Sequence, residues 1–542
     1  MDFARSVGSA SGPVLCRCRC ADGLGPMTTE TSAVEQKVNF SVSLKRRMGG
    51  PRYLIAGHWF LQFAGVLLFI FFQGLNTPHG LVTLQLAPER MAQIFGFSDG
   101  GSFLKAAFDL VATGHNTPQG NPEWTWVLNL WPPGMVWLDA GILRFSPLDY
   151  GVSIGLITAL LWSVTLAVVT WPFMRNLTST SAVILVELAV LGTSPFQSWM
   201  FDEGLFYADG LAAGFFLLGL ALIVNRVRSA APIQVWIRDG IYVGIAFAAA
   251  IYLRASYQLV PWVLAALAFA MVAVVIIKKI RGLSTLELRP QAILLVVTAL
   301  TIPILMQPYT AYVQQVRART QFVMLQDLVY ESVWQSPQFD KIPQWGLDGG
   351  ATLGCDIDPA ECALIHRAKS DGKVFTPKEL RDALVKAIVA HPLPFIGNRV
   401  SYVAKQWFAD EIGSYSHIKT DYMSGPVSYS SSDNLNPGQG LFYLILLIVA
   451  LVAACILAAR GRWALLIIPI MAMAILAPFA VVHVEVRYLI PLKLIGLLAP
   501  VLILMLREQP LRSVSSKSAV KSIPGEVLSR SLRQPNKLWF GA

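Results

Sequence analysis

The chain has 542 residues, of which 54% are hydrophobic and 14% are charged, and its formal net charge is +10. Soluble globular proteins carry about 25% charged residues, so this composition excludes an ordinary soluble domain as the main part of the chain. In a soluble protein the positive charge would suggest a nucleic-acid partner. Here the basic residues flank long apolar runs, which indicates membrane topology and no nucleic acid.

Long apolar runs predict an all-α polytopic membrane protein with about ten spanning helices. Tyr150 to Trp171 and Gln439 to Ala459 contain no charged side chain, and Leu205 to Val224 contains only Asp209. Each run reaches the roughly 20 residues that a helix needs to cross the hydrocarbon core, where backbone groups must be bonded internally. The predicted spans are 53–74, 150–171, 178–196, 205–225, 239–254, 258–277, 290–309, 439–459, 463–482 and 489–506.

Lysine and arginine lie at every second connection between these spans. By the positive-inside rule, those connections and both termini are predicted to be cytoplasmic. Two of the opposite, extracytoplasmic connections are long, and the second of them has the composition of a mixed outer domain. The predicted organisation is a tail at 1–52, spans at 53–309 with an outer loop at 75–149, the outer domain at 310–438, spans at 439–506 and a basic tail at 507–542.

The first outer loop carries an acidic residue ahead of an amphipathic pattern. After Ser98-Asp99-Gly100-Gly101, the apolar residues Phe103, Ala107, Leu110 and Val111 share one helical face, and Gly114 ends the pattern as a C-cap does. We expect a helix lying along the membrane surface, with its dipole favouring the ionised form of Asp99. Such a carboxylate could take a proton from a hydroxyl nucleophile, although an ordinary capping role is the alternative.

A second surface helix is predicted further along the same loop. Trp131-Pro132-Pro133-Gly134 precedes Met135 to Leu143, and prolines suit the first turn of a helix. Trp131 and Trp137 would then lie at headgroup depth. The prolines themselves are more simply explained as a rigid turn.

The other outer connections hold charged side chains close to the span ends. They are Asp202, Glu203, Arg254, His483, Glu485, Arg487 and, inside the last span, Lys493. A cation slightly within the outer leaflet is costly unless it is paired, and Arg and Lys at that depth could hold a lipid-linked phosphate. Snorkelling side chains and an internal salt bridge are the alternative explanation.

The six cysteines form no metal-binding pattern. Cys355 and Cys362 share the outer domain, where oxidation is permitted, and we expect a local disulfide between them, with two free thiols as the alternative. The sequence requires no cofactor, and it leaves the use of a divalent metal open.

Taken together, the stretches between 53 and 506 resemble the GT-C superfamily of membrane glycosyltransferases, which includes protein O-mannosyltransferases and lipid A aminoarabinose transferases. The order and sidedness of several short motifs carry this resemblance. They are Ser98 to Gly114, Trp131 to Gly134, Ser194-Pro195, Arg254, His391-Pro392 with the following Phe395 to Trp407, and Glu485 to Tyr488.

The resemblance implies transfer of a sugar from a polyprenyl-phosphate-linked donor on the outer face, with inversion at the anomeric carbon. Asp99 matches the first-loop acid that acts as general base. Many relatives have Asp-Glu at this place and this chain has Asp99-Gly100, so Asp202 or Glu203 could supply a second carboxylate. Arg254, Arg487 and Lys493 would lie near the donor phosphate, together with His483, Glu485 and Tyr488.

The sequence leaves several partners and functions open. The acceptor could be a lipid, a glycan or a protein, and the membrane is predicted to be a bacterial plasma membrane. A transporter or flippase of a polyprenyl-linked glycan could use the same arginines without chemistry, and a surface-polysaccharide ligase or polymerase would also use a lipid-linked donor. The long outer loops favour the glycosyltransferase.

Overall fold

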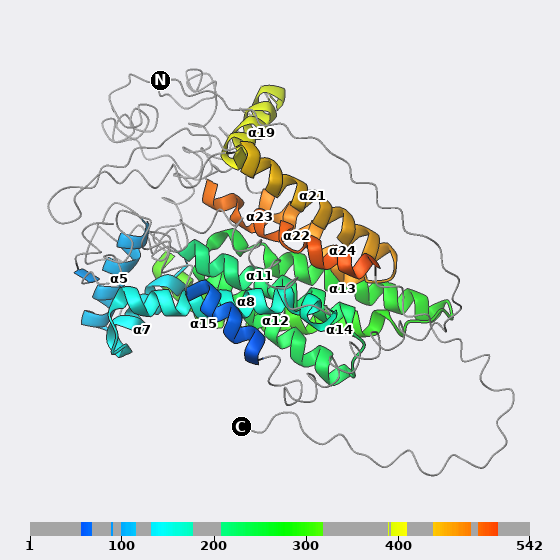
Figure 1. Cartoon of the computed structure of the whole chain (residues 1–542), viewed down its shortest axis with the longest axis horizontal. Helices are drawn as coiled ribbons and strands as arrows, with labels where there is room; N and C mark the ends of the chain where they lie inside the picture. The colour runs from blue at the N-terminus through cyan, green and yellow to red at the C-terminus, as the bar shows by residue number, and fades with distance from the viewer. Residues whose placement is uncertain are drawn as a thin grey trace, which may run out of the picture. The chain divides into compact units, whose positions relative to one another are not determined.

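The computed structural model describes residues 56–67, 88–89, 99–114, 132–176, 208–317, 389, 392–408, 437–477 and 486–507. Within these ranges every regular element is a helix. The chain divides into two units, residues 1–58 and 59–542, and the helices named by label below belong to the second (Figure 1).

Seven described helical stretches are long and apolar enough to cross a membrane, so the protein is a multi-pass, all-helical membrane protein in outline. Five are α8 (Tyr150–Asn176), α11 (Ala208–Arg228), α12 (Ile233–Leu253), α13 (Val260–Ile280) and α21 (Pro437–Ala459). The other two are α14 (Leu288–Leu305) running into α15 (Gln307–Arg317), and α23 (Ile490–Gly496) with α24 (Ala499–Arg507).

The remaining three predicted spans are described in part or not at all. The first, 53–74, is helical at 56–67, and the third, 178–196, lies outside the described residues. The ninth, 463–482, is described as far as residue 477, as a short 3-10 helix, η4 (Trp463–Leu466), followed by α22 (Ile467–Leu476). The count of ten therefore stays a prediction, as does the outer domain, of which the helix α19 (Pro392–Phe408) is the main described part.

Two helix boundaries differ from the sequence prediction for physical reasons. α12 begins at Ile233, six residues before the predicted start, because Pro232 favours a helix start and a helix can extend beyond the hydrocarbon core that hydropathy detects. The last span is divided at Leu497 and Leu498. Pro500 offers no backbone N–H and would clash with the carbonyl of Gly496 in a continuous helix.

Small residues allow the spans to approach closely. α11 packs against α8, α12 and α23, and α12 also packs along α14. On α12, Gly240 and Gly244 face α14, where added Cβ atoms would lie 3.0 Å from Val297 and 2.6 Å from Thr301. The Thr298 hydroxyl donates to the carbonyl of Gly240 at 3.1 Å. These are the small-residue and hydroxyl contacts typical of helix pairs in membranes.

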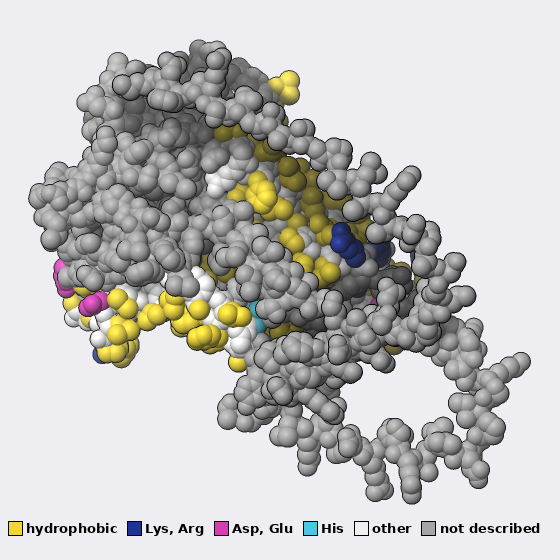
Figure 2. Space-filling view, in the orientation of Figure 1, with side chains coloured by type: hydrophobic (Ala, Val, Ile, Leu, Met, Phe, Trp, Pro, Cys, Tyr) yellow, Lys and Arg dark blue, Asp and Glu magenta, His cyan; other side chains and the backbone are white. Residues whose placement is uncertain are grey.

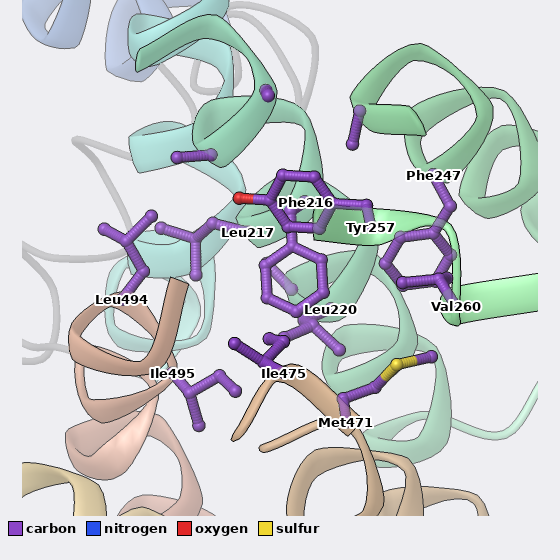
Figure 3. Close-up of a cluster of buried hydrophobic side chains, with 14 of the residues drawn as sticks. Phe216, Leu217, Leu220, Phe247, Tyr257, Val260, Met471, Ile475, Leu494 and Ile495 are labelled. Carbon is purple, nitrogen blue, oxygen red and sulfur yellow. The ribbon is translucent and has the colours of Figure 1, made fainter. Parts of the chain in front are cut away.

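The core lies where α11 meets the C-terminal helices. Figure 3 shows Phe216 and Leu220 of α11 facing Phe247 of α12, with Met471 and Ile475 of α22 and Leu494 and Ile495 of α23 on the other side. All of these side chains are buried. The amino-terminal and carboxy-terminal groups of spans therefore share one hydrophobic core.

The outward faces of the spans are apolar as well. On α13, Trp262, Phe269 and Ile276 recur every seventh residue and are 75%, 77% and 51% exposed. Figure 2 shows hydrophobic side chains over much of the visible flank of the described helices. A helix that is apolar all round is suited to hydrocarbon on the side that packs against nothing, so we assign these faces to lipid.

The charge pattern predicts which helix ends lie on the same side of the membrane. In the structure, ends that are predicted to share a side contact each other. Arg254 after α12 pairs with Asp209 at the start of α11, and both ends are predicted to face outside. At the other end of the same two helices, Arg226 pairs with Asp239. These contacts agree with the predicted grouping of ends. We call the first group the outer ends below, and the orientation itself stays a prediction.

Cysteine labelling tests this orientation. In a variant without native cysteines, we expect Ser370→Cys and Ser432→Cys to react with an impermeant thiol reagent in intact cells and Ser229→Cys to react after lysis only. Ser229 lies between α11 and α12, beside Arg226. Labelling of position 229 in intact cells would invert the assignment.

Candidate functional site

The two helices predicted in the first outer loop are present, and their position along the membrane surface stays a prediction. α5 (Asp99–Thr113) buries Phe103 and Ala107, as the amphipathic pattern predicts. It ends at Gly114, whose φ of 76° is the left-handed conformation that suits a C-cap glycine. Asp99 is the first residue of the helix, and its side chain lies outside the described part of the structure.

The second surface helix is held against both α5 and the bundle. α7 (Gly134–Phe145) follows Pro132 and Pro133 and packs along α5. A Cβ on Gly134 would collide with the backbone carbonyl of Tyr252, so a glycine is needed for this close approach to the end of α12. The Trp137 ring lies 5.6 Å from the ring of Tyr252 and 5.6 Å from that of Tyr312. These contacts fix the surface helices next to Tyr252, which lies two residues before Arg254 in the sequence.

α7 also carries an acid that sequence analysis did not single out. Asp139 is fully buried, and the Tyr150 hydroxyl at the start of α8 donates to its Oδ1 at 2.8 Å. Its Oδ2 has no hydrogen-bond partner among the described residues. Burial raises the pKa of Asp139 from 3.8 to about 8, although the Tyr150 hydrogen bond lowers it. The carboxyl is therefore protonated near neutral pH and ties the surface helices to α8 as a neutral group.

This buried acid makes stability depend on pH. The pKa of Asp139 is higher in the folded protein than in the unfolded chain, so stability falls as pH rises from about 4 to about 8, by about 1.4 kcal/mol per pH unit. Asp139→Asn keeps an acceptor for Tyr150 and removes the ionisation. We expect this variant to have a higher unfolding temperature than the wild type at pH 8, measured on purified protein in detergent.

Two comparisons sharpen the Asp139 prediction. Asp139→Ala removes the acceptor of the Tyr150 hydroxyl and should unfold at a lower temperature at every pH. The gap between wild type and Asp139→Asn should close near pH 4. A gap that stays constant across the pH range would contradict a protonated Asp139.

The outer ends of α11 and α12 hold a buried ion pair. Arg254 is the C-cap residue of α12 and is 2% exposed, and its Nε lies 2.7 Å from Oδ1 of Asp209. Its Cζ lies 5.1 Å from the centroid of the Tyr488 ring, which belongs to the 3-10 helix η6 (Val486–Leu489). Three segments far apart in sequence therefore meet at one guanidinium.

The helix ends suit these charges. Asp209 lies in the first turn of α11, where the helix dipole favours an anion, and Arg254 follows the last turn of α12, where it favours a cation. Tyr257 lies close by in η2 (Ala255–Tyr257). Burial raises the pKa of the Tyr257 hydroxyl well above its usual value, and the charge of Asp209 raises it further, so this side chain stays neutral.

A second buried cation lies in the last span. Lys493 is 2% exposed, and its Nζ lies 5.6 Å from the ring centroid of Trp407 at the end of α19. The Trp407 indole donates to the carbonyl of Gly440 at 2.8 Å, in the first turn of α21. α19 thus ends against the outer end of a span, which agrees with the predicted helix leading back toward the membrane.

The structure brings together some of the predicted site residues. Arg254 contacts Tyr488, which precedes Lys493 in the chain. Asp202, Glu203, His483, Glu485, Cys355 and Cys362 lie outside the described residues, as does the side chain of Arg487. Sequence analysis missed the pairing of Asp209 with Arg254, although an acid at the outer end of one span and a base at the outer end of the next were a usable signal.

A metal site was left open by the sequence. Among the described residues, no group of three or more His, Cys, Asp and Glu side chains could hold a metal ion. The candidate second carboxylates Asp202 and Glu203 lie outside those residues.

Comparisons with known proteins give one structural likeness. No protein-family model and no curated protein matches the chain. The chain is similar to ArnT from Cupriavidus metallidurans, solved in the apo state, at 14% identity and a TM-score of 0.28, over 82% of this chain and 78% of that one.

Proposed function

We propose that this protein is a membrane glycosyltransferase. It would move a sugar from a polyprenyl-phosphate-linked donor to an acceptor on the extracytoplasmic side, with inversion at the anomeric carbon. Asp99 would be the general base, and Arg254 with Lys493 would hold the donor phosphate, together with Arg487. No metal or other cofactor is assigned to the reaction.

One observation supports this proposal above the others. α5, which begins at Asp99, packs on α7, and α7 touches the backbone of Tyr252, two residues before the buried Arg254. The helix that begins at Asp99 and the buried Arg254 therefore belong to one group of packed helices at the outer ends. An acceptor hydroxyl would reach these helices from the water side. A lipid phosphate would reach them from the outer leaflet.

The expected reaction requires a carboxylate that accepts a proton and cations that lie near the phosphate. The acceptor oxygen attacks the anomeric carbon as Asp99 takes its proton, and the bond from that carbon to the phosphate oxygen breaks. The phosphodiester carries one negative charge, and the departing polyprenyl monophosphate carries up to two. Buried cations near this phosphate would stabilise the charge that develops in the transition state.

A flippase for a lipid-linked glycan is the second candidate. Arg254 and Lys493 are buried at outer ends of spans, and intramembrane cations also mark transport pathways. The surface helices α5 and α7 favour the transferase, because a flippase has no need to place an acid at the membrane surface.

Reconstitution separates the two candidates. In vesicles that carry a synthetic polyprenyl-phosphate sugar in the outer leaflet, a transferase should release polyprenyl phosphate and add one sugar mass to a supplied acceptor extract. Mass spectrometry of surface glycolipids from cells with and without the protein would identify the sugar and acceptor. Movement of a labelled donor between leaflets without any product of higher mass would instead indicate a flippase.

A further inference from the structure

The span formed by α14 and α15 is interrupted at Met306. α14 ends at Leu305 and α15 begins at Gln307. Pro308 has no backbone N–H to donate to the carbonyl of Ile304, and its ring would crowd that carbonyl in a straight helix. The proline explains why the helix is weak at this point, which we call the joint. It does not explain what holds the two helices in the bent arrangement.

The hydroxyl group of Tyr252, from α12, lies in the joint. It donates to the carbonyl of Leu305 at 2.8 Å and accepts from the backbone N–H of Tyr309 at 3.3 Å. In an uninterrupted helix, the N–H of Tyr309 would donate to that same carbonyl, four residues earlier. A side chain that enters the hydrogen-bond ladder of a helix in this way is a known cause of bending.

Aromatic rings connect the joint to the helix α7. The rings of Tyr252 and Tyr309 are nearly perpendicular with their centroids 5.7 Å apart, and the side-chain amide of Gln258 donates to the Tyr309 hydroxyl at 2.9 Å. The Trp137 ring of α7 lies 5.6 Å from the ring of Tyr252 and 5.6 Å from that of Tyr312, on α15. Trp137 therefore contacts both the residue that bends the joint and the helix beyond it.

We propose that the Tyr252 hydroxyl is a latch that holds the joint bent, and that the joint has a second, straighter state. In that state the N–H of Tyr309 bonds to the carbonyl of Leu305, and the hydroxyl of the half-buried Tyr252 bonds to water. The change exchanges hydrogen bonds without losing any. Two states related in this way can be close enough in free energy for both to be populated.

The two states differ in the position of α15 and of the first-loop helices. Straightening the joint moves α15 directly, and it moves α7 through the contact between Trp137 and Tyr312. α7 packs along α5, which begins at Asp99, so α5 follows. The inference concerns the movement of helices at the outer ends, and it holds whether or not the protein transfers a sugar.

The test measures distances between spin labels by double electron–electron resonance, on full-length protein without native cysteines in lipid nanodiscs. One label is at Ala311→Cys, on the exposed face of α15, and the other replaces the exposed Leu160 of α8 or Trp262 of α13. Tyr252→Phe keeps the ring and removes the hydroxyl. We expect at least one mean distance to change by about 2–3 Å, since a change of about 20° in the bend moves a residue about 8 Å beyond the joint by that amount.

Tyr242→Phe is the matched control. It removes a hydroxyl from the exposed Tyr242 on the same helix and should leave both distances unchanged. A label pair at Ala112→Cys on α5 and Leu160→Cys follows the first-loop helices. Tyr252→Phe should change this distance as well. In a Trp137→Leu background, Tyr252→Phe should still move α15 and should no longer move α5.

Pro308→Ala provides a second route to the straighter state. It restores a backbone N–H at the joint, so it should move the Ala311 label in the same direction as Tyr252→Phe does. Movement in the opposite direction, or unchanged Ala311 distances in Tyr252→Phe, would overturn the latch. A shift of α5 that persists in the Trp137→Leu background would overturn the proposed route from α15 to the first-loop helices.

Discussion

Replacing Asp99 with Asn should lower the rate of sugar transfer by about 10²–10⁴-fold, the usual contribution of a positioned general base. Asn keeps the size of the side chain at the first residue of α5 and removes only its charge and basicity. The variant should therefore fold, insert and bind the donor as the wild type does. The measurement is the transfer rate at matched protein level with a saturating polyprenyl-phosphate sugar.

Asp109→Asn is the control for this prediction. Asp109 lies on the same helix, half-buried, and its backbone carbonyl rather than its carboxylate accepts the hydroxyl of Thr113. We expect its transfer rate to be close to that of the wild type. Near-normal transfer by Asp99→Asn would contradict the assignment and direct attention to Asp202 and Glu203.

Replacing Arg254 with Ala should have the second large effect, on donor affinity. The variant loses the cation that would hold the phosphate, and the partner left behind is Asp209, an anion near the expected phosphate that would repel it. Donor Kd should rise by more than tenfold, with little change in the preference among acceptors. Arg487→Ala should act in the same direction.

Arg144→Ala is a suitable control for the arginine variants. Arg144 is exposed on α7 and lies over the ring of its neighbour Phe145, so its loss should leave donor affinity unchanged. Arg254→Lys keeps the charge but lacks the fork, and its affinity should lie between those of wild type and Arg254→Ala. Unaltered donor affinity in both Arg254→Ala and Arg487→Ala would make these residues structural.

The parts of the fold that follow local rules were predictable from sequence. Uncharged runs located α8 and α21 to within a few residues, since only a helix satisfies its backbone in lipid. The amphipathic pattern before Gly114 and the prolines before Gly134 located the two surface helices, because capping and apolar spacing act within a few residues.

The pairing of distant side chains was not predictable in the same way. Hydropathy gives the position of a span along the chain and not the rotation of one span against the next. The contact between Asp209 and Arg254, 45 positions apart in the sequence, depends on that rotation. Asp139 was overlooked for a related reason: its burial comes from the packing of α7 against α5 and α8, and its own helix gives no sign of it.

The outer ion pair also bears on how the chain enters the membrane during synthesis. Insertion by the translocon costs about 2.5–3.5 kcal/mol for a lone charge at the centre of a helix, and less toward its ends. α11 and α12 would each carry such a cost if they left the translocon one at a time. The linker at residues 229–232 is short enough for them to leave as an antiparallel hairpin, with Asp209 already beside Arg254. We therefore expect α11 to stay next to the translocon until α12 has been synthesised.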